Sequence, residues 1–175
     1  MTSKTLDVAS DAAFQRLEAA GGDPSRLPVA LATVIIIYSA QGVIDNGGFR
    51  YFFESDFPGT PPYAMFIDAY RRIGAVEAAD ALSRAVAQFP FEDAHLHVQK
   101  RNEFMDRLAE TSDIFSLGDA VCGDRRVWDR LEQWRRRRNG GLDEPETPRQ
   151  RRGATGDAVG GGAPASRGAH KRPRP

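Results

Sequence analysis

The chain has 175 residues, 41% of them hydrophobic, and its 24 Lys and Arg residues balance its 24 Asp and Glu residues. This length and apolar content suit one folded domain with an additional segment. The single cysteine, Cys122, excludes a disulfide within the chain. The longest apolar run, 29–40, is shorter than the roughly 20 residues of a membrane span, and the N-terminus lacks the apolar stretch of a signal peptide. We therefore expect a soluble, cytoplasmic protein that does not bind membranes.

The balanced net charge conceals two parts of opposite sign. Residues 1–134 hold 20 acidic and 13 basic side chains, a net charge of −7. Residues 135–175 hold 4 acidic and 11 basic side chains, a net charge of +7. Such asymmetry is typical of an acidic folded region that carries a basic interaction arm.

The first third of the chain predicts two helices and a sharp turn. Apolar residues three and four apart predict a helix over 6–20, and a longer helix over 28–44 is apolar on nearly all sides, as a central helix would be. We favour helix over strand for the β-branched run 34–37, because no other segment offers a strand partner. The motif Asn46-Gly47-Gly48-Phe49 then predicts a helix end and a tight turn, since glycine adopts positive φ freely. A short aromatic helix over 49–55 follows.

The rest of the chain alternates apolar periodicity with residues that end helices. The expected helices span 63–73, 76–89, 97–109, 113–121 and 124–136. The sequence therefore predicts an all-α fold: a compact bundle of about six to eight helices around the central apolar helix, within residues 1–138. Residues 139–175 are rich in Gly, Pro and Arg and have almost no large apolar side chains, which predicts a disordered tail.

Three elements of this pattern resemble a bacterial all-α family: Asn46-Gly47-Gly48-Phe49, then Phe52-Phe53, then Ile73-Gly74-Ala75. The characterised member of that family is a DNA-mimic protein, a dimer that binds a helix-turn-helix transcription factor. The resemblance spans roughly residues 28–134. It implies the same all-α fold, a homodimer and a protein partner. This chain departs from the family pattern at one pair of positions: family members carry Gln and Asn where this chain has Tyr51 and Ser55 (or Glu54).

The acidic residues carry the mimicry hypothesis. Glu103, Asp106, Glu110 and Asp113 follow one another at spacings of three and four, which predicts one helix face. Glu77 and Asp80 do the same on another predicted helix. Such carboxylates would stand where a DNA-binding protein expects phosphates. The alternative is an ordinary solvated surface, partly neutralised by Lys100, Arg101 and Arg107.

The basic residues support a second hypothesis. Arg135, Arg136, Arg137 and Arg138 begin the basic segment and would bind nucleic acid by releasing counterions. The same segment would equally screen the acidic region, or be a solvated extension with no role.

A ligand site is the least supported hypothesis. Backbone N–H groups at the Asn46–Phe49 turn would bind an anion, yet a helix end followed by a reversal explains the motif equally.

The aromatic cluster from Phe49 to Phe66 would be either core or a dimer surface. His95 and His97 lack a third metal ligand nearby, and Cys122 is expected to be buried and inert. No base, nucleophile and orienting group assemble, so we expect a non-enzymatic interaction protein without a cofactor.

Overall fold

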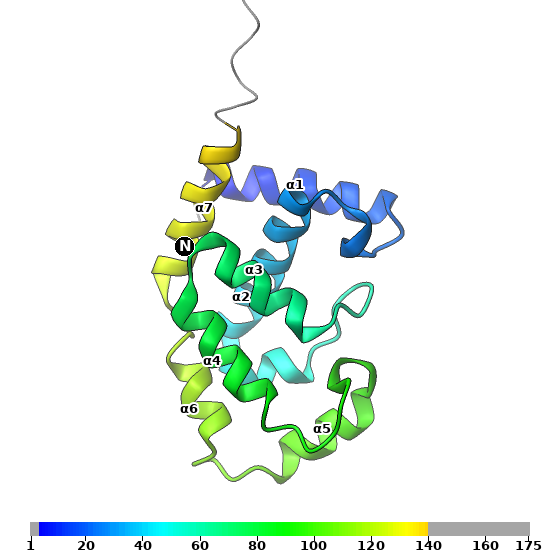
Figure 1. Cartoon of the computed structure of the whole chain (residues 1–175), viewed down its shortest axis with the longest axis vertical. Coiled ribbons are helices and arrows are strands. Elements are labelled where there is room, and N and C mark those ends of the chain that lie inside the picture. Colours follow the sequence, from blue (N-terminus) through cyan, green and yellow to red (C-terminus); the bar gives the residue numbers. More distant parts are fainter. Residues whose placement is uncertain (1–3, 140–175) are drawn as a thin grey trace, which may run out of the picture. The chain divides into compact units, whose positions relative to one another are not determined.

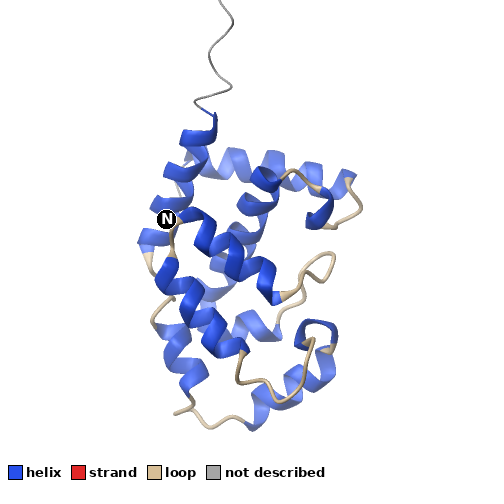
Figure 2. Cartoon of the chain, in the orientation of Figure 1, coloured by secondary structure: helices blue, strands red, loops and turns tan. Residues whose placement is uncertain are grey.

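The structure, a computed structural model, describes residues 4–139, and these residues form helices and connecting loops without a strand (Figures 1 and 2). They belong to the first of two units of the chain, Met1–Glu144. The helices are α1 (Lys4–Ala19), η1 (Pro24–Arg26), α2 (Val29–Glu54), α3 (Tyr63–Ile73), α4 (Val76–Val86), η2 (Ala94–Leu96), α5 (Val98–Arg107), α6 (Asp113–Asp119) and α7 (Arg125–Asn139). The seven α-helices confirm the predicted all-α bundle. The predicted tail falls outside the described residues, apart from Asn139, which belongs to α7.

Helix α2 is the central element. Twelve of its 26 residues are buried, and it contacts α1, α3, α5, α6 and α7. Within the described range it is the helix whose length and hydropathy would also suit a membrane span. Here its β-branched run, Val34 to Ile37, is buried among the surrounding helices. The preference for a central helix over a buried strand is therefore confirmed.

The predicted turn interrupts α2. Gly47 has φ −171° and ψ 26°, and Gly48 has φ 60° and ψ −154°, a combination that glycine alone adopts readily. The segment Phe49–Glu54 resumes the helix. Phe49, Phe52 and Phe53 are buried, and the rings of Phe52 and Phe53 meet edge-on with centroids 5.2 Å apart. The aromatic cluster is thus mainly core, while the Tyr51 side chain is 52% exposed.

Helices α4, α5 and α6 end two or three residues earlier than predicted, and α7 ends three residues later. Helix α4 ends at Val86 rather than at Phe89, in line with the poor fit of helical backbone just before Pro90. Helix α5 ends at Arg107 because Leu108 is extended, with φ −71° and ψ 136°. Helix α6 then begins after Ser112, whose hydroxyl accepts a hydrogen bond from the Ile114 N–H (3.4 Å). By contrast, Gly74 ends α3 as predicted, in the left-handed conformation.

Candidate functional site: an acidic face and the core that positions it

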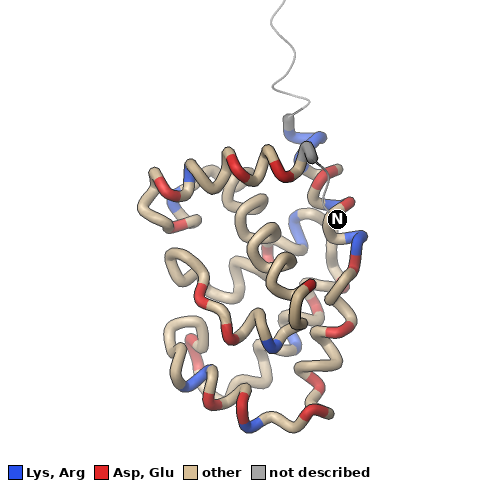
Figure 3. The backbone as a smooth tube through the Cα atoms, turned by 180° about the vertical axis from the view of Figure 1, so that it is seen from behind, with Lys and Arg blue, Asp and Glu red and all other residues tan. Residues whose placement is uncertain are grey.

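The acids from Glu103 to Asp119 form the α5–α6 acidic face, which we define as Glu103, Asp106, Glu110, Asp113 and Asp119. All five side chains are exposed, and Arg107 is the single basic residue in this segment. The prediction of one helix face is wrong, because α5 ends before Glu110. Glu103 and Asp106 lie on α5, Glu110 lies in the connecting loop and Asp113 opens α6. Figure 3 shows several acidic positions (red) at the lower end of the described helices, where α5 and α6 lie in Figure 1.

Ion pairs neutralise only part of this face. Glu103 pairs with Arg107 (3.2 Å), and Asp106 pairs with Arg50 of α2 (3.1 Å). Both pairs are solvent-exposed, so each contributes at most about 1 kcal/mol and can exchange for another cation. Glu110 and Asp113 have no ion pair within the described part of the chain. The face therefore keeps uncompensated negative charge.

Glu77 and Asp80 share an exposed side of α4, as predicted, but each is matched by a base from a neighbouring helix. Glu77 lies 3.6 Å from Arg130 of α7, and Asp80 lies 3.6 Å from Arg71 of α3. A hydrogen bond from its own backbone N–H lowers the pKa of Glu77, and the Arg130 charge lowers it further. Surface ion pairs of these two acids therefore link α4 to α7 and to α3.

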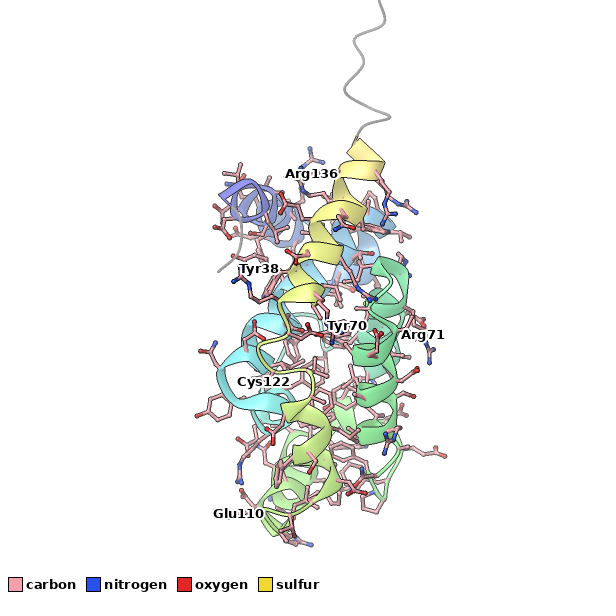
Figure 4. All side chains as sticks on the ribbon, turned by 90° about the vertical axis from the view of Figure 1, so that its left-hand side faces the viewer. Tyr38, Tyr70, Arg71, Glu110, Cys122 and Arg136 are labelled. Atoms are coloured by element: carbon pink, nitrogen blue, oxygen red, sulfur yellow. The ribbon has the colours of Figure 1, made fainter. Side chains whose placement is uncertain are left out.

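The four arginines predicted to bind nucleic acid form the last turn of α7 and not a single patch. Successive helical residues point about 100° apart, so Arg135 to Arg138 surround the helix. Arg136 pairs with Glu132 (2.6 Å), and the Arg138 guanidinium lies 5.0 Å from the Trp134 ring centroid. Their positive charge suits the C-terminal end of a helix. In Figure 4, Arg136 and Glu110 lie at opposite ends of the described helices.

The Asn46–Phe49 turn positions α6 and leaves little space for an anion. The Asn46 side-chain amide donates back to the Gly42 carbonyl (2.6 Å). A Cβ on Gly48 would lie 3.8 Å from the carbonyl carbon of Gly118 and 3.9 Å from an Asp119 carboxylate oxygen. Helix α6 and the Asp119 carboxylate therefore lie against the turn where an anion would have to bind. The geometry supports the interpretation of the motif as a helix end followed by a reversal.

A buried polar network beside this turn was not predicted. The Gln41 side chain, fully buried, accepts from the Tyr70 hydroxyl (3.0 Å) and donates to Asp45 (2.6 Å) and to the Val121 carbonyl (3.1 Å). Asp45 in turn accepts from the Trp128 indole (2.9 Å). Burial raises the pKa of Tyr70 far above its usual range, and the Asp45 charge raises it further. The network fixes α3, α7 and the α6–α7 loop on α2.

Arg101, predicted to be a surface base, is instead 2% exposed. Its guanidinium pairs with Asp56 (2.8 Å) and donates to the carbonyls of Ser55 (3.3 Å) and His95 (3.2 Å). It thus fastens α5 to the loops that follow α2 and α4. It does not neutralise the α5–α6 acidic face.

Two further predictions concern reactive side chains. Cys122 is exposed, which corrects the expectation of a buried thiol, because it lies in the loop between α6 and α7. Between residues 4 and 139 no three His, Cys, Asp or Glu side chains are grouped as a metal site would require.

A protein-family model described as DMP19-like protein matches residues 25–139, from η1 to the end of α7. The chain belongs to the DMP19-like protein family. The name DMP19 stands for DNA mimic protein 19, and membership fits a DNA-mimic role in general. Comparisons with curated proteins and with solved structures gave no match. Helix α1 precedes the matched range.

Proposed function

We propose that this protein is a non-enzymatic DNA mimic, and that it binds a transcription regulator of the helix-turn-helix class through the α5–α6 acidic face. The observation that carries the proposal is the charge of segment 103–119, with five acidic side chains against one basic one, all exposed. Family membership supports the DNA-mimic role.

The chemistry of DNA binding explains why such a face would suit a regulator. Proteins bind the DNA backbone through Lys and Arg contacts to phosphates, largely without reading sequence. Carboxylates displayed without matching bases offer the same side chains an alternative anion. Glu110 and Asp113 meet this condition most fully, whereas Glu77 and Asp80 already share their charge with arginines.

Charge reversal tests the proposal. The full-length protein would serve as bait for a lysate of the source organism, treated with nuclease and eluted with a salt gradient. Regulators retained by the bait would then be tested for competition between this protein and their own DNA. We expect the triple variant Glu103→Lys, Asp106→Lys, Glu110→Lys to bind about tenfold more weakly or worse, because rim charges of the wrong sign repel the partner.

The matched control reverses charge on α4 with Glu77→Lys and Asp80→Lys. This variant should keep most of the affinity. Equal binding by the α5–α6 variant and the unaltered protein would rule out the α5–α6 acidic face. Retention of no DNA-binding protein at low salt would count against mimicry itself.

We also propose that the protein acts as a homodimer in the cytoplasm, as the family resemblance implies. Sedimentation equilibrium over a range of concentrations would measure the assembly directly. A single species with a mass of 19.2 kDa at all concentrations would contradict the dimer.

A further inference from the structure

A cleft lies where α1, the start of α2 and the end of α7 meet. In Figure 4 this end of α7 carries the label Arg136 and lies far from Glu110. Its volume is about 230 Å³. The walls are mainly apolar and are formed by Ala9 and Ala12 of α1, Leu31 and Val34 of α2, and Trp134 of α7. One wall therefore comes from the helix outside the range matched by the DMP19-like family.

Two arginines of α7 give this apolar cleft a positive charge. Arg135 and Arg138 both line it, and Arg138 stacks on Trp134. The Nε atom of Arg135 is buried and has no hydrogen-bond partner among the described residues. Neither arginine forms an ion pair with a described acidic side chain. The two guanidinium groups that line the cleft are therefore not matched by a described carboxylate, and their positive charge favours an anionic ligand.

We propose that this cleft binds a small amphipathic carboxylate, with its apolar body between the three helices and its carboxylate on Arg135. A carboxylate is the acceptor that a planar guanidinium binds best, because two parallel N–H donors match its two oxygens. The flat ring of Trp134 and the aliphatic walls exclude water from the rest of the ligand.

The size of the cleft limits the apolar body. An apolar cavity of about 150 Å³ holds benzene, so this cleft has room for a body of roughly eight carbon atoms. A medium-chain fatty acid such as octanoate, or a small aromatic acid, fits that limit. The proposal does not depend on the α5–α6 acidic face, since the two sites share no residue.

The test is a titration of the full-length protein with sodium octanoate, followed by two-dimensional ¹H–¹⁵N spectra. The chain has two tryptophans, so the indole N–H region contains an internal control. We expect the Trp134 signal to move on binding, while that of Trp128, which donates to Asp45 outside the cleft, stays in place. The neutral analogue 1-octanol should bind at least about tenfold more weakly, because it lacks the charge-assisted hydrogen bonds.

Two variants on the same helical turn distinguish binding in the cleft from a general effect of removing an arginine. Arg135→Gln should weaken octanoate binding at least about tenfold, whereas Arg137→Gln, which changes a neighbouring exposed arginine, should leave it unchanged. If Arg135→Gln fails to fold, Ala12→Leu, which fills the cleft, provides the second variant and should also abolish the Trp134 shift. A Trp134 signal that does not respond to octanoate, or equal affinity for octanol, would overturn the proposal.

Discussion

The Cα of Gly118 lies directly against the backbone nitrogen of Phe49, so that a Cβ at position 118 would stand only 2.5 Å from that atom. This contact joins α6 to the segment that follows the turn in α2. Two glycines, Gly48 and Gly118, thus meet where the acidic segment is anchored to the core. The position of the α5–α6 acidic face depends on this close contact between α6 and the backbone of α2.

Gly118→Ala should therefore destabilise the fold. The new methyl group would force α6 away from rigid backbone, at a cost of about 1–3 kcal/mol in the free energy of unfolding. Gly42→Ala is the matched control, because Gly42 is also helical but a Cβ added there would have nothing within 4 Å. That substitution should be neutral or stabilise by up to about 1 kcal/mol. Urea denaturation of both variants measures the difference, and similar midpoints would contradict the close contact.

Tyr70→Phe should cost about 1–3 kcal/mol at neutral pH. The substitution keeps the ring but removes the donor to Gln41, whose buried oxygen would then lack a partner. Adding Gln41→Leu should recover little of the loss, because Gln41 also donates to Asp45 and to the Val121 carbonyl. An unchanged unfolding midpoint for Tyr70→Phe would show that water replaces the hydroxyl.

Alkaline pH should destabilise the protein through its buried tyrosines. Burial raises the pKa of Tyr63 to about 12 and that of Tyr70 beyond that, from a usual value of 10.0. Above pH 10 the unfolded chain therefore loses protons that the folded protein retains, so stability falls as pH rises. Between pH 10 and 12, each tyrosine contributes a slope of about 1.4 kcal/mol per pH unit. Urea denaturation across this range should show a shallower slope for Tyr63→Phe and for Tyr70→Phe; parallel curves would contradict the assignment.

Arg101→Met should destabilise by about 2–4 kcal/mol. The variant leaves the carbonyls of Ser55 and His95 without their donor, and it removes the clamp between α5 and two loops. Arg101→Lys should restore little, because an ammonium cannot reach several acceptors in one plane. The adjacent exposed Lys100, changed to Met, is the control and should alter thermal stability little. Equal melting temperatures for the Arg101 and Lys100 variants would refute the clamp.

Removing residues 140–175 tests the alternative of nucleic-acid binding through the basic segment. Because Arg135 to Arg138 surround α7 and two of them already have partners, we expect them to bind DNA weakly on their own. If the full-length chain binds DNA with strong salt dependence, the truncated chain should lose most of that affinity. Equal DNA binding by the full-length and truncated chains would instead indicate that the DNA contact lies on α7.

The parts of the fold that sequence could predict were those set by local chemistry. Glycine marked the break in α2 and the end of α3, and apolar periodicity located the buried faces of the helices. The end of α5 could not be predicted in this way. No residue between Leu108 and Thr111 breaks a helix, and the extended Leu108 belongs to a loop that lets Ser112 cap α6. The acids of the candidate face were therefore identified by spacing, but assigned to the wrong element.

Interactions between distant segments were also beyond a single sequence. Spacing could not show that Arg50, Arg71 and Arg130 neutralise some of the candidate acids and spare others. It could not show that Arg101 turns inward, since its acceptors are carbonyls 46 and 6 residues away. One feature of the sequence pointed to the Gln41 network: Gln41 and Asp45 are polar and lie four positions apart in a largely apolar helix.

The separation of charge along the bundle, with uncompensated carboxylates at Glu110 and Asp113 and arginines at the far end of α7, has a consequence for the approach to a partner. A molecule charged in this way experiences a torque in the field of a basic surface. It would rotate to lead with α5 and α6 while still separated by solvent, and like-charged ends would repel a wrong orientation. The direction of docking would thus be selected before the first side chains touch, and added salt would slow productive encounters more than it would speed dissociation.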